Sequence, residues 1–249
     1  MDANNYWAIT EGDIEIQNPV TDRKLRLLDD YCDVGDGLRV LDIGCGKAWL
    51  MRYWADKYTI IGTGLDINPR FVNFARARRA ALGALSFIDG PALDFEPTPE
   101  GYDIVMCLGA SSALGGLVEA IDWMVAATRP GGKIVLGEMT LKHRPLSDQG
   151  EILPHEAIDT IGIIERHGAQ VSALISASDA DFERYASHHR HATLTWAGEN
   201  PAHPDNADVL ARSRADWQHY LKWIRPYFGW TVFVGRKPAE QAARGAAGG

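Results

Sequence analysis

Short runs of β-branched and other apolar residues alternate with longer segments of helical period from Leu38 to Lys237. This alternation is typical of βα units that wind a parallel sheet. The apolar runs predict seven strands, at residues 39–44, 58–67, 85–90, 102–109, 132–139, 169–178 and 231–237. The first five are almost continuously apolar, as strands buried on both faces are. We therefore predict an α/β fold with a seven-stranded, mostly parallel sheet and helices on both faces.

Segments of helical period fill the chain between these strands. An early helix begins after Thr21, its N-cap residue, and four more are predicted at residues 47–57, 69–82, about 116–128 and 155–167. Residues 179–230 hold far more chain than a crossover between the last two strands needs, and they read as two helices rich in aromatic side chains. We expect this insert to form a helical lid over a substrate.

Composition argues against several functions. The 33 acidic residues exceed the 25 basic residues by 8, so the chain has no broad positive field for a phosphate backbone. The three cysteines lack a CxxC spacing, which indicates neither a disulfide framework nor a zinc site and favours a reducing compartment. No signal segment and no run of about 18 apolar residues is present. We expect a soluble, cytoplasmic protein with no nucleic acid, membrane or metal partner.

The segment VLDIGCGKA (40–48) lies where the first strand ends and a helix begins. Gly44 and Gly46 permit a tight turn and a close approach of a ligand to the backbone, and the helix N-terminus offers unpaired amides. A dinucleotide fingerprint has a third small residue where this chain has Trp49. Asp66 ends the second strand, where a carboxylate can accept hydrogen bonds from both hydroxyls of a ribose. The pattern favours a nucleoside over a pyrophosphate.

A further acid, Asp89 in FIDGPA, ends the third strand at the same edge of the sheet. The ordered set VLDIGCGKA, GLDI, FIDGPA and YDIVMCLGASSALGG (102–116) resembles the class I S-adenosylmethionine-dependent methyltransferases. The similarity covers about residues 20–175 and the final strand. It implies S-adenosylmethionine as the cofactor, and a last strand that runs antiparallel beside the sixth.

The resemblance also implies which residues contact the cofactor. Gly44, Cys45 and Gly46 would line its methionine and ribose part, and Asp66 would take the ribose hydroxyls. Asp42 would either contact the cofactor or only brace the glycine turn through backbone amides. For Asp66 the alternative is a cap on the following helix.

At the other end of the cofactor, Ile67 would pack on the adenine, and Asp89 with Gly90 would meet the adenine amino group. A simple turn before Pro91 is the alternative for Asp89. Three consecutive residues would lie behind the sulfonium: Cys107, Leu108 and Gly109.

The methyl acceptor is less strongly indicated by the sequence. Enzymes that methylate exocyclic base amines carry an (N/D/S)PP(Y/F/W) motif after the fourth strand, where this chain has CLGASSALGG. With the acidic balance of the chain, this argues against nucleic acid and favours a small-molecule acceptor. Methyl transfer requires alignment, exclusion of water and often removal of a proton. His143, in the loop after the fifth strand, is the first candidate for the proton acceptor, and Glu138 could orient the acceptor or act as the base.

Aromatic and histidine side chains of the N-terminal arm and the insert are expected to contact the acceptor: Tyr6, Trp7, Tyr185, His188, Trp196, Tyr220 and Trp223. The run HHRH (188–191) does not indicate a metal site, because only its first and last histidines share a helix face.

We interpret the chain as a single domain of five segments: an N-terminal arm and helix (1–37), a cofactor-binding core (38–178), the lid insert (179–230), the final strand (231–237) and a disordered tail (238–249). Two other functions stay open. One is a nicotinamide-dependent oxidoreductase, which Trp49 disfavours. The other is a nucleoside-binding sensor or scaffold without turnover.

Overall fold

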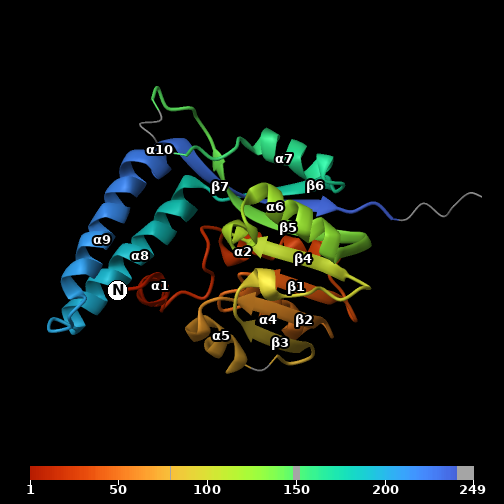
Figure 1. Cartoon of the computed structure of the whole chain (residues 1–249), viewed down its shortest axis with the longest axis horizontal. Coiled ribbons are helices and arrows are strands. Elements are labelled where there is room, and N and C mark those ends of the chain that lie inside the picture. Colours follow the sequence, from red (N-terminus) through yellow and green to blue (C-terminus); the bar gives the residue numbers. More distant parts are fainter. Residues whose placement is uncertain (79, 148–151, 240–249) are drawn as a thin grey trace, which may run out of the picture.

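A seven-stranded sheet forms the centre of the computed structural model, which describes residues 1–78, 80–147 and 152–239 (Figure 1). The strands lie in the order β3-β2-β1-β4-β5-β7-β6. Their bounds are β1 (Arg39–Ile43), β2 (Ile61–Asp66), β3 (Ala84–Asp89), β4 (Tyr102–Leu108), β5 (Thr128–Leu141), β6 (Gln170–Ser176) and β7 (Phe228–Arg236). All seven predicted strands are present, and β5 is several residues longer at its start than expected.

The first five strands pair in parallel, whereas β7 is antiparallel to both β5 and β6. The prediction of a mostly parallel sheet with an antiparallel last strand is confirmed. Because β7 inserts between β5 and β6, β6 and not β7 is the edge strand. The strand order reverses between β1 and β4, and in open α/β sheets ligands bind at this switch point, outside the carboxyl ends of the strands.

Successive residues of the central strands enter two different cores, because side chains alternate between the faces of a sheet. Val40 of β1 joins one core and Leu41 the other. The first core is covered by α2 (Asp22–Leu25), α3 (Leu28–Tyr31), α4 (Trp49–Lys57) and α5 (Pro69–Arg76). The second is covered by α6 (Leu117–Ala127) and α7 (Ala157–Arg166). Helices on both faces, as predicted, explain why these strands are apolar throughout.

The insert forms α8 (Asp179–Glu199), α9 (Asn206–His219), a π-helical stretch (Tyr220–Ile224) and the short α10 (Arg225–Tyr227). A capping box between Ser178 and Asp181 starts α8. Helices α8 and α9 lie side by side at one end of the sheet, and α1 (Ala3–Thr10) contacts α8 (Figure 1).

Both ends of the insert lie at the carboxyl edge of the parallel strands. The insert follows the end of β6 and leads into the start of β7, where Phe228 pairs with Leu141 at the end of β5. The insert therefore stands over the same edge as the glycine turn after β1.

Two further expectations concern other parts of the chain. Thr21 is the N-cap of α2, as expected, and its side chain accepts a hydrogen bond from the Lys24 amide. The predicted tail lies outside the described residues from position 240 onward. No helix in the described ranges is both long enough and apolar enough to span a membrane.

Candidate cofactor and acceptor site

The turn after β1 needs its glycines. Gly44 and Gly46 have φ angles of +65° and +52°, which side chains rarely allow. A Cβ on Gly44 would stand 2.2 Å from the Cβ of Ala110, in the loop after β4. The loops that follow the two strands at the switch point therefore meet here, and only glycine permits the contact.

Asp66 connects this turn to β2. Its Oδ2 accepts a hydrogen bond of 2.8 Å from the Gly46 amide, and its Oδ1 accepts one of 2.8 Å from the Asn68 amide. Burial raises the pKa of Asp66, and the two backbone donors oppose this rise. The carboxylate thus braces the turn while it also lines the cavity described next.

A cavity of about 550 Å³ opens at the switch point, and we call it the sheet-edge cavity. Its walls come from the glycine turn, the end of β2, the turn after β3 and the loop after β4. Seven residues predicted to bind the cofactor line it: Gly44, Gly46, Asp66, Ile67, Gly90, Leu108 and Gly109. The structure therefore brings most of the predicted set together around one space.

The other predicted cofactor residues lie around this space rather than in its lining. Cys107 is fully buried in the sheet, and Cys45 lines a small cavity of about 50 Å³ nearby. Asp89 accepts a hydrogen bond of 2.8 Å from Arg76 of α5, which lowers the pKa of Asp89.

Asp42 also faces the small cavity and is 5% exposed. Burial raises its pKa to about 8, and the neighbouring Asp66 carboxylate adds to the rise. At neutral pH this carboxyl group is therefore mostly protonated, and a positive charge nearby would lower its pKa and stabilise its ionised form.

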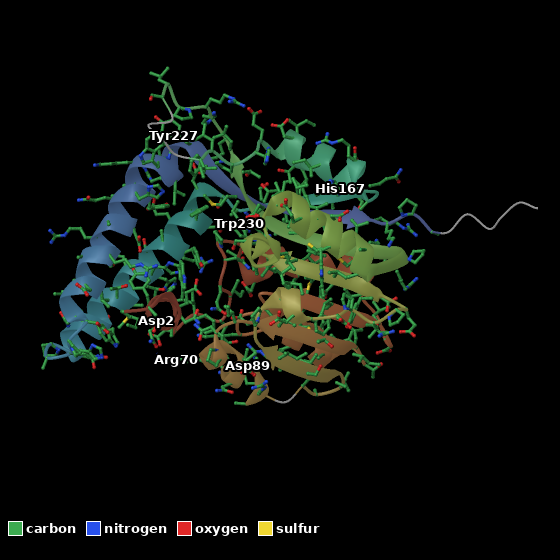
Figure 2. The ribbon with its side chains drawn as sticks, viewed as in Figure 1. Asp2, Arg70, Asp89, His167, Tyr227 and Trp230 are labelled. Atoms are coloured by element: carbon green, nitrogen blue, oxygen red, sulfur yellow. The ribbon has the colours of Figure 1, made fainter. Side chains whose placement is uncertain are left out.

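A second cavity, of about 370 Å³, lies between the N-terminal arm, the insert and β7, and we call it the lid cavity. Four of the predicted acceptor residues line it: Tyr6, Trp7, Tyr185 and Tyr220. Three aromatic residues that we did not predict to contact the acceptor also line it: Phe182, Trp217 and Trp230. Figure 2 shows Trp230 between the insert and the sheet.

The two cavities adjoin, because Trp7, Gln17, Gly109 and Tyr185 line both. Gly109 follows β4 with a φ of +95°, and a Cβ there would stand 2.6 Å from the indole ring of Trp230. Position 109, which carries no side chain, therefore lies at the boundary between the sheet-edge cavity and the lid cavity.

Comparison with known proteins agrees with this geometry. A family model described as a methyltransferase domain matches residues 40–132. The chain is 27% identical to an S-adenosylmethionine-dependent methyltransferase from Geobacter sulfurreducens, solved in complex with S-adenosyl-L-homocysteine. The two structures superpose with a TM-score of 0.84 over 93% of this chain and 97% of that one. This chain has the class I fold and is an S-adenosylmethionine-dependent methyltransferase.

Two curated relatives are similar to the methyltransferase at the level of sequence. The uncharacterized protein YjhP of Escherichia coli is 26% identical over 247 residues, which cover 94% of this chain and 98% of that protein. A probable fatty acid methyltransferase of Pseudomonas putida is 27% identical over 214 residues, which cover 80% of this chain and 52% of that protein.

The remaining predicted acceptor residues of the methyltransferase do not line the lid cavity. His188 is exposed on α8. Trp196 packs edge-on against His203, with ring centroids 5.1 Å apart, and Trp223 lies against Tyr227 at 5.7 Å.

The two predicted proton acceptors also lie outside both cavity linings. Glu138 accepts a hydrogen bond from the Ser111 hydroxyl, and burial raises the pKa of this glutamate. The side chain of His143 is exposed, and its backbone amide donates to the Tyr227 carbonyl at 3.3 Å. Their roles stay predictions.

The N-terminal arm supplies a buried acid that the sequence did not single out. Glu11 is 6% exposed and lines the sheet-edge cavity. Lys47, which follows the glycine turn, donates from Nζ to the carbonyl oxygens of Glu11 and Ile14 at 2.8 and 2.7 Å. The glycine turn therefore fixes the arm over the site.

Among the residues that the structure describes, no group of three or more His, Cys, Asp or Glu side chains is placed to hold a metal ion.

Proposed function

We propose that this methyltransferase methylates a small, largely apolar acceptor held in the lid cavity. Its cofactor is S-adenosylmethionine. The proposal depends on one observation, which is that the sheet-edge cavity and the lid cavity adjoin at Gly109. A cofactor in the first cavity and an acceptor in the second would meet where the two spaces join.

The residues around the sheet-edge cavity fit the cofactor. The glycine turn lets a ligand approach the backbone, and the carboxylate of Asp66 can accept hydrogen bonds from ribose hydroxyls beside those it already accepts. Ile67 is exposed at the cavity wall and offers an apolar surface for a base. An ammonium group of the cofactor beside Asp42 would lower the raised pKa of this carboxyl group and pair with its ionised form.

When bound, the cofactor supplies an electrophilic methyl group on a positively charged sulfur. The contribution of the chain is then alignment and exclusion of water. The arm and the insert enclose the acceptor between aromatic rings, and Trp230 with Gly109 sets its distance from the sheet edge.

The walls of the lid cavity favour an uncharged acceptor with an aromatic or other flat apolar part. The charged side chains of the lining interact with the walls themselves. Asp216 accepts a hydrogen bond of 2.7 Å from Tyr6, and Arg212 lies over the Tyr6 ring at 3.8 Å. Arg190 donates to Ser213 at 2.9 Å. Aromatic faces therefore dominate what remains for a ligand.

We infer that nucleic acid is not the acceptor, because the enclosed volume of about 370 Å³ suits a small molecule. Three free thiols, at Cys32, Cys45 and Cys107, agree with a reducing compartment, and we infer the cytoplasm.

A screen of labelled methyl transfer tests the proposal. The purified protein is incubated with methyl-labelled S-adenosylmethionine and a panel of phenols, aromatic amines, thiols and short fatty acids. We expect transfer to at least one aromatic member of the panel. Cofactor binding without transfer to any small molecule, but with transfer to RNA or protein, would contradict the proposal.

A further inference from the structure

Three side chains from two distant parts of the chain meet at the boundary between the two cavities. Glu11 comes from the N-terminal arm, and Tyr185 and His189 come from successive turns of α8. Glu11 lines the sheet-edge cavity, His189 lines the lid cavity, and Tyr185 lines both. The cluster therefore stands between the space for the cofactor and the space for the acceptor.

The Glu11 carboxylate is held on both oxygens. Its Oε1 accepts from the Tyr185 hydroxyl, and its Oε2 accepts a hydrogen bond of 2.7 Å from Gln17. Burial and the Glu11 charge raise the pKa of Tyr185 well above its usual value, so this hydroxyl stays protonated and remains a donor. Glu11 thus has a fixed position.

His189 lies against this fixed carboxylate. Its Nε2 is buried and lies 3.2 Å from Glu11 Oε1, an ion-pair distance without the alignment of a hydrogen bond. The rings of Tyr185 and Trp7 pack on the imidazole with centroids 4.2 and 5.9 Å away. Since Nε2 faces Glu11, Nδ1 is the ring nitrogen left for a ligand.

Other charges near this imidazole are directed elsewhere. Arg190 of the same helix donates to Ser213 of α9, and Lys47 Nζ contacts the backbone carbonyl of Glu11 rather than its carboxylate. From α9, Arg212 lies over the Tyr6 ring and Asp216 accepts from the Tyr6 hydroxyl, whereas Glu11 lies 3.2 Å from His189 Nε2.

We propose that His189 accepts the proton of the acceptor's nucleophile at Nδ1, and that Glu11 and Tyr185 are positioning residues that hold its ring. The inference rests on the proposed function and narrows its substrate class to acceptors whose nucleophilic atom carries a proton: a hydroxyl, a thiol or a protonated amine. The negative charge of a carboxylate 3.2 Å from Nε2 favours a proton on that nitrogen, and Nδ1 then keeps its lone pair.

The atoms balance in this step. The X–H bond of the acceptor breaks, its proton goes to Nδ1, and its electron pair stays on X, which bonds to the methyl carbon. The bond between the methyl carbon and sulfur breaks, and its electron pair stays on sulfur, which becomes a neutral thioether. The imidazolium then returns its proton to water.

A first experiment needs no acceptor and no turnover. Nitrogen NMR of histidine-labelled protein, saturated with S-adenosylhomocysteine, reports which ring nitrogen of neutral His189 carries the proton. The exposed His191 is the internal reference, and its NMR signals are identified by their absence from the His191→Gln variant. We expect the Nε2–H form alone in the wild type and a mixture in Glu11→Gln. An Nδ1–H form in the wild type would overturn the proposal.

A second experiment compares phenol with the more acidic 4-nitrophenol as methyl acceptors. We expect His189→Gln to slow transfer to phenol by about 10²-fold or more and transfer to 4-nitrophenol much less, because the latter loses its proton without help. His191→Gln should leave both rates unchanged. A purely structural role would slow both probes equally, and that result would overturn the proposal.

Calorimetry with S-adenosylhomocysteine separates the two levels of inference. Absence of binding to the wild type counts against the proposed function, and the tautomer of His189 in the ligand-free protein then decides the present proposal alone. Transfer to neither phenol likewise leaves the tautomer measurement to decide the present proposal. We expect the dissociation constant of S-adenosylhomocysteine for His189→Gln to lie within about threefold of the wild-type value. The rate of methyl transfer to phenol by this variant should no longer fall at acidic pH. An unchanged pH profile would overturn the role of His189.

Discussion

The Asp66 carboxylate at the end of β2 accepts a hydrogen bond of 2.8 Å from the amide of Gly46, in the turn after β1. One side chain thereby sets the position of the glycine turn and presents oxygens to the sheet-edge cavity. The alternative that the sequence offers for Asp66 is a cap on the next helix, but Asn68 is the N-cap of α5. Bracing of the turn and binding of a ribose are compatible in this geometry.

Asp66→Ala should weaken binding of S-adenosylhomocysteine by roughly 1.5–3 kcal/mol, the scale of hydrogen bonds to charged groups. Isothermal calorimetry measures this change, and thermal unfolding shows whether the turn survives. Glu100→Gln is the control, since Glu100 is exposed and pairs with Arg39 far from the cavity. An unchanged dissociation constant would leave Asp66 with its bracing role alone.

Asp42→Asn should stabilise the protein more at high pH than at low pH. The folded-state pKa of about 8 lies above the ordinary value of 3.8, so the unfolded chain loses this proton at lower pH than the folded chain does. Stability present below about pH 4 is therefore lost as the pH rises toward 8. We expect the gain from the asparagine to grow to about 2–5 kcal/mol at pH 8.

Urea unfolding at several pH values measures this gain, and Asp36→Asn is its control. Hydrogen bonds from Thr59 lower the pKa of Asp36, so the effect of the control variant should have the opposite dependence on pH. The same gain for Asp42→Asn at pH 5 and pH 8 would show that burial does not hold a proton on this carboxyl group.

Gly109→Ala should cost about 1–3 kcal/mol of stability, because the new Cβ meets the Trp230 ring at 2.6 Å in a backbone conformation with a φ of +95°. It should also reduce methyl transfer more than cofactor binding, since the two cavities join there. Gly198→Ala in α8 is the matched control. Nothing lies within 4 Å of a Cβ at position 198, and we expect a gain of about 0.5–1 kcal/mol.

Lys47→Met should release the N-terminal arm. The buried ammonium group donates to carbonyls of residues 11, 12 and 14, and loss of these bonds should cost about 1.5–3 kcal/mol. Hydrogen exchange should then become faster in residues 1–18. In the wild type we expect S-adenosylhomocysteine to slow exchange in this arm and in the insert; identical protection with and without ligand would make the insert a static cap.

The sequence predicts the sheet well, because strands that are buried on both faces must be apolar throughout and the turns between them need glycine at fixed places. Gly44 and Gly46 are such places, with positive φ and no room for a Cβ. The same local logic indicates Asp66, which stands at a strand end next to the turn that it braces.

The lid side of the site could not be predicted in the same way. Glu11 and His189 lie far apart in the chain, and their contact depends on how α1 packs on α8. No periodicity in the sequence predicts this contact. The adjacent histidines 188 and 189, in an insert rich in aromatic residues, are the sequence feature that points to it. Tyr220 and Trp223 belong to a π-helical stretch, which changes the helical phase, so Tyr220 lines the cavity while Trp223 packs on Tyr227.

A crystal structure of the complex with S-adenosylhomocysteine tests the central claim most directly. We predict that its ribose hydroxyls bind Asp66 and that its sulfur lies beside Gly109, facing the lid cavity and the aromatic walls around it. A sulfur that points away from the lid cavity, or a ribose bound elsewhere than at Asp66, would contradict the assignment of the two cavities to cofactor and acceptor.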